Sequence, residues 1–130
     1  MTNGAQPPRP TDAELEILAV LWSTGPATVR QVHELISQRR PAQYSTILKF
    51  MQIMADKGLL LRNEEQRAHI YKAARPREWT QQQLAGHLLE RAFSGSAKAL
   101  LIGALSAKKT TKSELAEIRK LVDEYAKGAK

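Results

Sequence analysis

Side chains able to read a DNA groove are found in the segment from Tyr44 to Arg62, YSTILKFMQIMADKGLLLR. Helical spacing gathers its apolar residues on one side and leaves a second face with hydroxyl, amine, amide and aliphatic groups. Such groups donate to phosphates and base edges, pair with adenine, or contact a thymine methyl. The predicted DNA-facing residues are Ser45, Thr46, Lys49, Gln52 and Ile53. The predicted core-facing residues are Tyr44, Ile47, Leu48, Met51, Met54 and Ala55.

Two helices are expected before this segment, and each opens with a reciprocal cap. The sequences TDAE from Thr11 and TVRQ from Thr28 both place a threonine three residues before a Glu or Gln. Gly25-Pro26 ends the first helix, and Pro41 separates the second from a third helix at 44–57. Three short helices therefore follow one another along the chain.

The hydrophobic period changes after Gly58. Strand-like runs at 59–62 and 69–72 flank a polar loop at 63–67, which suits the tip of a hairpin. Three helices followed by a two-stranded ribbon predict a winged helix-turn-helix, a mainly α domain with a small β wing. In such domains the last helix enters the major groove, and the wing commonly reaches neighbouring phosphates.

Cationic residues stand near the third helix and the wing. Arg39 and Arg40 directly precede the helix and are predicted to contact the DNA backbone. Thr28 and Arg30 open the second helix, whose free N–H groups could meet a phosphate. For Thr28, capping alone is the alternative role. The wing cations predicted to lie over the DNA backbone are Arg62, Arg67, His69 and Lys72. Their alternative role is that of solvated strand edges that discourage aggregation.

Composition limits the class of protein. The 20 Lys and Arg residues against 13 Asp and Glu give a net charge of +7, which favours a polyanionic partner but also suits an anionic membrane surface or solubility. The absence of cysteine excludes disulfides and thiolate chemistry. The apolar runs fall far short of the roughly 20 residues that a membrane span needs, and there is no signal-peptide pattern. We therefore expect a cytoplasmic protein that does not insert into membranes.

The chain is expected to have three parts: a disordered lead at 1–10, a winged-helix DNA-binding domain at 11–75, and a helical dimerisation domain at 76–130. Pro76 marks the hinge, and capping patterns begin at Thr80 and Thr111. The last part is too small to form a large core alone, so its apolar faces favour a homodimer. The alternative is a monomer in which it folds back on the winged helix. The predicted dimerisation residues are Leu84, Leu88, Phe93, Leu100, Leu101, Leu105, Leu115, Ile118, Leu121, Val122 and Tyr125.

No constellation for catalysis stands out. The histidines His33, His69 and His87 fall in different expected elements, and His87 with Glu90 lacks a third metal ligand. A Gly-rich phosphate loop and a Gly-x-Ser-x-Gly elbow are both absent. The sequence therefore predicts no enzyme, no metal site and no cofactor.

Four segments, DAELEILAVLW, ATVRQVHELIS, YSTILKFMQIMADKGLL and RAHIYKAA, resemble the penicillinase-repressor family of bacterial winged-helix regulators. The later segments FSGSAKALLIGALS and SELAEIRKLVDE are similar to that family's dimerisation segment. The resemblance implies a homodimeric repressor of inverted-repeat operators. In the family these operators often lie upstream of β-lactamase genes, which confer antibiotic resistance, or of related stress genes. It also implies that a membrane sensor protease relieves repression by causing cleavage of the repressor.

Three features depart from relatives. Ile53 stands where many relatives have an arginine, so the resemblance implies different operator contacts at that position. Gly103-Ala104 replaces the Asn-Phe pair at the cleavage site of some members, and the cysteine motif of the copper-responsive branch is absent.

Two alternatives stay open. For the signal that relieves repression, the alternative to proteolysis is a small ligand bound between the wing domain and the C-terminal part. A winged-helix module that docks another protein, without DNA, is the alternative function.

Overall fold

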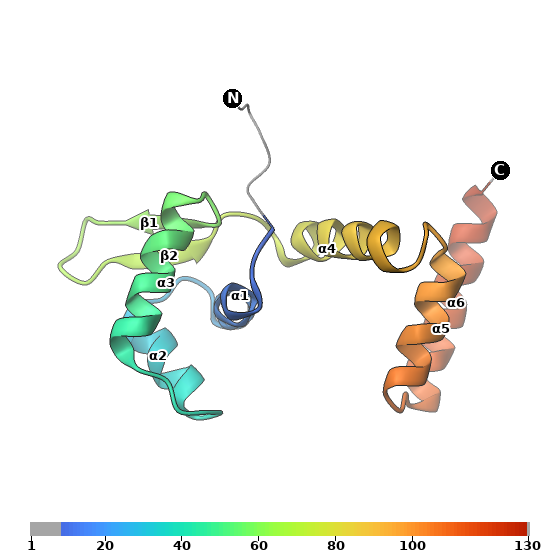
Figure 1. Ribbon diagram of the computed structural model, residues 1–130, viewed down its shortest axis with the longest axis horizontal. Coiled ribbons are helices and arrows are strands. Elements are labelled where there is room, and N and C mark those ends of the chain that lie inside the picture. The colour runs from blue at the N-terminus through green and yellow to red at the C-terminus, as the bar shows by residue number, and fades with distance from the viewer. Residues whose placement is uncertain (1–8, 130) are drawn as a thin grey trace. The chain divides into compact units, whose positions relative to one another are not determined.

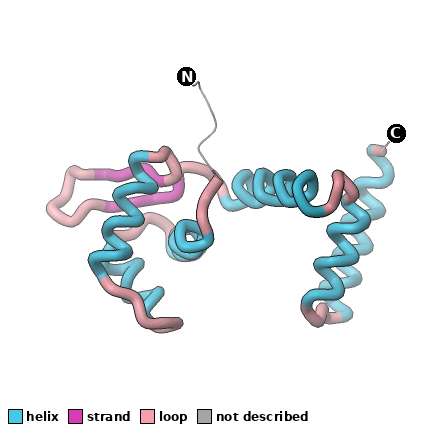
Figure 2. The backbone as a smooth tube through the Cα atoms, in the orientation of Figure 1, coloured by secondary structure: helices cyan, strands magenta, loops and turns pink. Residues whose placement is uncertain are grey.

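The computed structural model describes residues 9–129, so the disordered lead expected at 1–10 lies outside the described residues except for its last two positions. The elements, shown in Figures 1 and 2, are α1 (Asp12–Thr24), α2 (Val29–Ser37), α3 (Tyr44–Asp56), β1 (Leu60–Asn63), β2 (Ile70–Ala73), α4 (Arg77–Ala92), α5 (Ala97–Ala107) and α6 (Lys112–Gly128). The chain divides into two compact units within α4. We call the part up to Leu84 the winged-helix unit and the part from Ala85 onward the C-terminal unit. The functional boundary expected at residue 76 stays a prediction.

The winged-helix unit confirms the predicted fold class. Its two strands pair antiparallel from Leu60 with Ala73 to Asn63 with Ile70, one residue later in the chain than expected. Ala27 adds a bridge to this ribbon, because its N–H donates to the Tyr71 carbonyl at 2.9 Å and its carbonyl accepts from the Tyr71 N–H at 2.8 Å. The bridge joins the wing to the chain just before α2.

One hydrophobic core holds the winged-helix unit together. α3 packs on α1, α2 and β1, and α1 also packs on β2. The side chains of Val32, Ile36, Met51 and Met54 are fully buried between the helices, and Leu60 and Tyr71 close the core from the wing. Burial of such side chains from water supplies the main driving force for this fold.

The helix starts follow the capping predictions at all but one site. Thr11 and Thr28 form complete capping boxes with Glu14 and Gln31, and the Thr111 hydroxyl accepts from the Glu114 N–H at 3.0 Å. The cap expected at Thr80 is wrong. α4 begins at Arg77, because the Pro76 carbonyl already accepts from the Trp79 and Thr80 N–H groups, and Thr80 is buried inside the helix.

In the C-terminal unit, α5 begins at Ala97 and is capped by Ser96, whose hydroxyl accepts from the Ala99 N–H. Neither α5 nor α6 has a buried side chain. Phe93, which follows α4, packs against Gly103, so close that a Cβ at position 103 would lie 3.3 Å from its ring. None of the described helices is long and apolar enough to cross a membrane.

Candidate nucleic-acid interface

The exposed face of α3 carries the predicted set of polar groups. Its residues, all exposed, are Ser45, Thr46, Lys49, Gln52, Ile53 and Asp56. On the opposite side Ile47, Met51 and Met54 are buried, with Leu48 and Ala55 packed partly against the core. Ile53 is 38% exposed, so a bare aliphatic group does stand among the polar ones. The period of α3 therefore places hydroxyl, amine and amide groups together on one surface.

Tyr44 is a correction to the predicted core face. It is 46% exposed, and its ring stands edge-on to that of His33 with 5.7 Å between centroids. As the first residue of α3, it lies beside the preceding turn rather than over the core. The pattern also missed Phe50, which is partly buried against the core.

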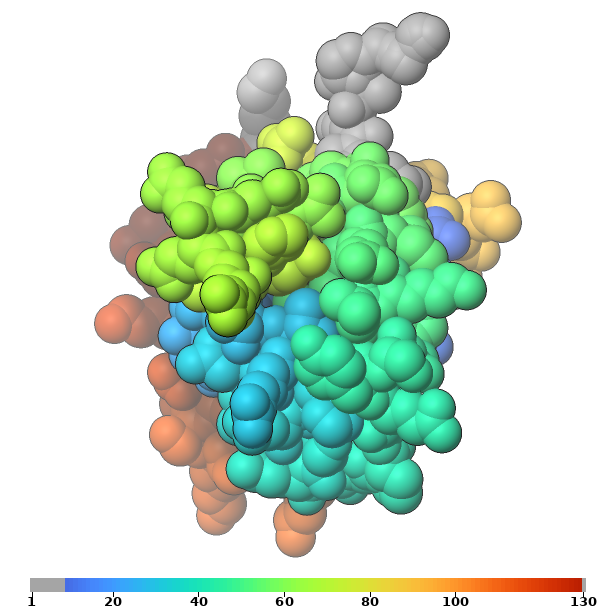
Figure 3. Space-filling view, turned by 90° about the vertical axis from the view of Figure 1, so that its left-hand side faces the viewer, coloured from blue at the N-terminus to red at the C-terminus, as the bar shows by residue number. Residues whose placement is uncertain are grey.

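The wing lies next to α3, and together they cover one face of the winged-helix unit (Figure 3), with α2 in blue below the lime-coloured wing. Arg67, His69 and Lys72 are exposed and have no ion pair within residues 9–129. Arg62 donates through Nε to Glu64 Oε2 at 2.7 Å. Hydrogen bonding to Tyr71 and then to Glu64 raises the pKa of Arg62.

The strand register separates two of the predicted wing cations. Arg62 is opposite Tyr71, and Lys72 is opposite Leu61. Directly opposed residues share a face of a ribbon and successive residues alternate, so Arg62 and Lys72 lie on opposite faces. The structure therefore does not gather all the wing cations on one surface.

Thr28 caps α2, and Arg30 lies exposed in its first turn. The Thr28 hydroxyl accepts from the Gln31 N–H at 3.2 Å and so acts as a cap. Arg30 is exposed and forms a long ion pair, 3.9 Å, with Glu34 one turn further along α2. This pair lies within one helix and joins no other element.

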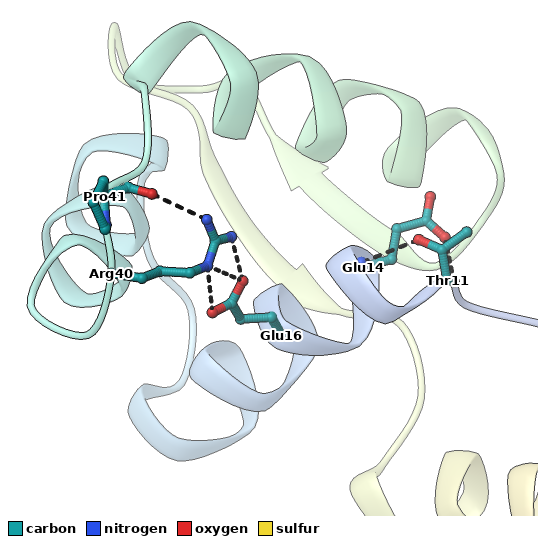
Figure 4. Close-up of polar contacts among 5 residues, drawn as sticks. All are labelled: Thr11, Glu14, Glu16, Arg40 and Pro41. Carbon is teal, nitrogen blue, oxygen red and sulfur yellow. Dashed lines mark hydrogen bonds and ion pairs between the residues drawn. The ribbon is translucent and has the colours of Figure 1, made fainter.

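The turn from α2 to α3 holds Arg39 and Arg40, which differ in their surroundings. Arg39 is exposed and has no ion pair among the described residues, whereas Arg40 is bound to Glu16 of α1 with Nη2 2.6 Å from Oε1 (Figure 4). This hydrogen bond from Arg40 is the main cause of the lowered pKa of Glu16. The nearby charge of Arg39 lowers it further.

A second carboxylate of α1 binds the other end of α3. Glu14 is 3% exposed, and its two oxygens accept from Lys57 Nζ at 3.0 and 2.8 Å. Burial would raise the pKa of Glu14, but the hydrogen bonds from Lys57 and Thr11 outweigh it and lower the pKa below its ordinary value. Sequence reasoning found Glu14 only as a capping partner. Glu16 and Lys57 gave no signal, because both ion pairs join residues far apart in the chain.

Comparison with known proteins decides the family. The family model described as penicillinase repressor matches residues 10–124. The chain belongs to the penicillinase repressor family. It is 39% identical over 93 residues to the transcriptional regulator BlaI of Mycobacterium tuberculosis, in both strain CDC 1551 / Oshkosh and strain ATCC 25618 / H37Rv. That match covers 70% of this chain and 67% of BlaI.

Among solved structures, the chain is similar to the solution structure of the DNA-binding domain of the repressor BlaI. The TM-score is 0.50 at 25% identity, over 55% of this chain and 88% of that domain. The resemblance inferred from the sequence is thus confirmed. This penicillinase repressor family member is a transcriptional regulator with a winged-helix fold and not an enzyme.

In this member of the penicillinase repressor family, the residues predicted for dimerisation all lie near or at the surface of the single chain. Tyr125 is 79% exposed. The other exposed members are Leu88, Leu101, Leu105, Leu115, Leu121 and Val122. The half-buried members are Leu84, Phe93, Leu100 and Ile118. Sequence reasoning missed Ile102, which is also exposed.

Proposed function

We propose that the protein is a homodimeric transcriptional repressor that binds a two-fold symmetric, inverted-repeat DNA operator in the cytoplasm. The observation that carries this proposal is the polar face of α3 beside the wing, in a unit similar to the DNA-binding domain of BlaI. α3 enters the major groove, where a helix fits and base edges are distinguishable.

Each predicted contact has a role set by its chemistry. Ser45, Thr46, Lys49 and Gln52 face bases and phosphates, while Ile53 contacts a thymine methyl. The phosphate-contacting residues proposed for the backbone on either side are Thr28, Arg30, Arg39, Arg67, His69 and Lys72. Arg40 and Arg62 are weaker candidates for phosphate contact, because Glu16 and Glu64 already occupy their guanidinium groups.

Homodimerisation through the C-terminal unit rests on its uncovered apolar faces. Since α5 and α6 bury no side chain within one chain, a second copy is the natural cover for Leu101, Leu121, Val122 and Tyr125. Two α3 helices spaced about one DNA turn apart, roughly 34 Å, then require a symmetric operator. Linkage of two half-site contacts raises affinity through effective concentration.

Release from the operator has two candidate routes. In the first, a membrane sensor protease causes cleavage in the segment that holds Gly103-Ala104. That segment lies on α5, where Gly103 packs under Phe93 and the neighbouring Ile102 is exposed. The second route is a small ligand. Detection of cleaved protein in cells exposed to a β-lactam would favour the first route over the second.

The proposed function is tested by selection of duplexes from a random-sequence pool, followed by titration of the selected and a scrambled duplex at two salt concentrations. We expect an inverted repeat that binds at least about 10³-fold more tightly than the scrambled duplex. Affinity should fall steeply with salt, because the bound cations release counterions from DNA. Failure to enrich any sequence, with no salt-sensitive binding, would instead favour a module that docks another protein.

A further inference from the structure

The side chain of Arg40 links the turn between α2 and α3 to Glu16 of α1 (Figure 4). Arg40 Nε lies 3.2 Å from each oxygen of Glu16, and Nη2 donates to Oε1 at 2.6 Å. Nη1 donates to the carbonyl of Pro41 at 3.1 Å. A guanidinium held along one edge by a carboxylate and at its third nitrogen by the main chain has a fixed orientation.

The start of α3 depends on this turn. Gln43, the cap residue of α3, makes no side-chain cap hydrogen bond, unlike the caps of α1 and α2. The His33 ring contributes one more link, through Nε2 to the Ala42 carbonyl at 2.8 Å. Ser45 and Thr46, proposed to face DNA, lie in the first turn of α3 and take their position from the turn before it.

The ion pair also changes what Arg40 can offer to DNA. Like any ordinary glutamate, Glu16 is ionised at neutral pH, and hydrogen bonding to Arg40 lowers its pKa further. Its negative charge offsets that of Arg40, whereas Arg39 and Lys49 have no ion pair among residues 9–129. A phosphate would have to compete with Glu16 for the same N–H groups.

A parallel contact exists at the other end of α3, where Lys57 binds Glu14. Two carboxylates of α1 therefore hold the two ends of the helix proposed to enter the groove. Lys57 lies beyond the last turn of α3, so that pair fixes the exit of the helix, and the Glu16–Arg40 pair fixes its entry.

We infer that Glu16 and Arg40 are positioning residues for DNA recognition: Arg40 acts by holding the entry turn of α3 against α1, and not by contact with phosphate. This inference rests on the proposed function. Indirect coupling of this kind typically changes an affinity by about 2- to 30-fold. The effect falls on sequence-specific binding, because non-specific affinity depends on charge rather than on the exact placement of Ser45 and Thr46.

The test uses the full-length chain, the duplex that the wild type selects from a random pool, and a scrambled duplex. Glu16→Gln and Arg40→Gln are each expected to weaken binding to the selected duplex by about 2- to 30-fold, with an unchanged salt slope. The double variant should bind no more weakly than the weaker single variant. Glu78→Gln is the matched control for Glu16→Gln, because it adds the same charge at an exposed residue of α4 that has no ion pair among residues 9–129.

If Arg40 instead contacted a phosphate, the two affinities, the salt slope and the effect of Glu16→Gln would all differ from these expectations. Arg40→Gln would then weaken both duplexes and lower the salt slope by about 0.9, and Glu16→Gln would tighten binding because it frees Arg40. Either result overturns the inference. So would additive losses in the double variant.

Exchange of the charges at positions 16 and 40 also distinguishes a positioning role of Arg40 from a phosphate contact. Glu16→Arg with Arg40→Glu restores an ion pair but leaves no cation at position 40. We expect the swap to bind the selected duplex more tightly than Arg40→Glu alone, and binding as weak as that of Arg40→Glu would overturn the inference. If melting curves show that the swap does not fold, the double variant Glu16→Gln with Arg40→Gln decides. If the wild type selects no duplex at all, it is the proposed function that fails.

Discussion

The winged-helix unit and the C-terminal unit differ in whether their apolar side chains are buried within one chain. Every buried hydrophobic side chain of the described chain lies between Ile17 and Tyr71, in the winged-helix unit. α5 and α6 bury none, although leucines, an isoleucine and a tyrosine stand on their surfaces. The first unit completes its core within one chain. The second has the apolar residues of a core but leaves them exposed in one chain, which is typical of a surface that a partner covers.

The largest expected effect is on the C-terminal unit. Leu101→Asp places a charge in the proposed dimer surface, where burial without a partner is costly, so the dimer should be lost. Loss of the second half-site should weaken operator binding by about 10²- to 10⁴-fold. Light scattering after size exclusion checks the mass. Ser106→Asp, on another side of α5, is the control, and a dimer that survives Leu101→Asp would contradict the surface.

A cavity in the core of the winged-helix unit should lower the free energy of unfolding by an amount that does not depend on a second copy of the chain. Ile36 is fully buried, so Ile36→Ala is expected to lower the free energy of unfolding by about 2–5 kcal/mol. Urea titration followed by the fluorescence of Trp22, which packs against the same core, and Trp79 measures this loss.

A matching variant in the C-terminal unit, Leu105→Ala, is unfolded with urea at several protein concentrations for comparison with Ile36→Ala. Leu105→Ala should destabilise the chain most where the wild type is dimeric, and its cost should shrink on dilution. Equal, concentration-independent costs for Ile36→Ala and Leu105→Ala would show that the two units do not differ in the proposed way.

Lys49→Ala tests the exposed face of α3. If the amine pairs with a guanine, the change should cost about 1–3 kcal/mol of binding to the selected duplex and relax specificity at one position. Competition binding with single-base variants of that duplex gives the position. Lys112→Ala removes the same charge from the C-terminal unit as a control. A uniform loss on all duplexes would reassign Lys49 to phosphate.

The smallest expected effect concerns Glu14. Glu14→Gln keeps an acceptor but removes the charge, and we expect it to destabilise the winged-helix unit by about 1 kcal/mol at neutral pH. Because the folded-state pKa of Glu14 is lowered, the wild type has this advantage above the ordinary value of 4.5 and loses it as the pH falls through the folded-state pKa. The melting temperatures of the two proteins should therefore differ at neutral pH and converge at acidic pH.

The sequence predicted what local rules decide. Capping boxes at Thr11 and Thr28 involve residues three apart, and the period of α3 placed Ser45, Thr46, Lys49 and Gln52 outward. Those features need no knowledge of the rest of the chain. Tyr44 failed because the same period says nothing about where the core ends along a helix axis.

What could not be predicted depends on contacts distant in the chain. Arg40 meets Glu16 at a separation of 24 residues, and Lys57 meets Glu14 at 43. In the sequence Arg40 was predicted only as a DNA contact, and Lys57 carried no prediction at all. The start of α4 also escaped prediction, because a threonine followed by Gln at the third position marks a cap only where the helix has not already begun.

The backbone bridge between Ala27 and Tyr71 has a consequence for DNA reading. Both of its hydrogen bonds are shorter than 3 Å and both residues are buried, so the bridge joins the base of the wing directly to the start of α2. In the proposed complex, we therefore expect contacts from Arg30 and from Lys72 to start from a common base whose dimensions are set before DNA binds. The protein can then reject a duplex whose groove width does not match that base, even where every base pair is correct.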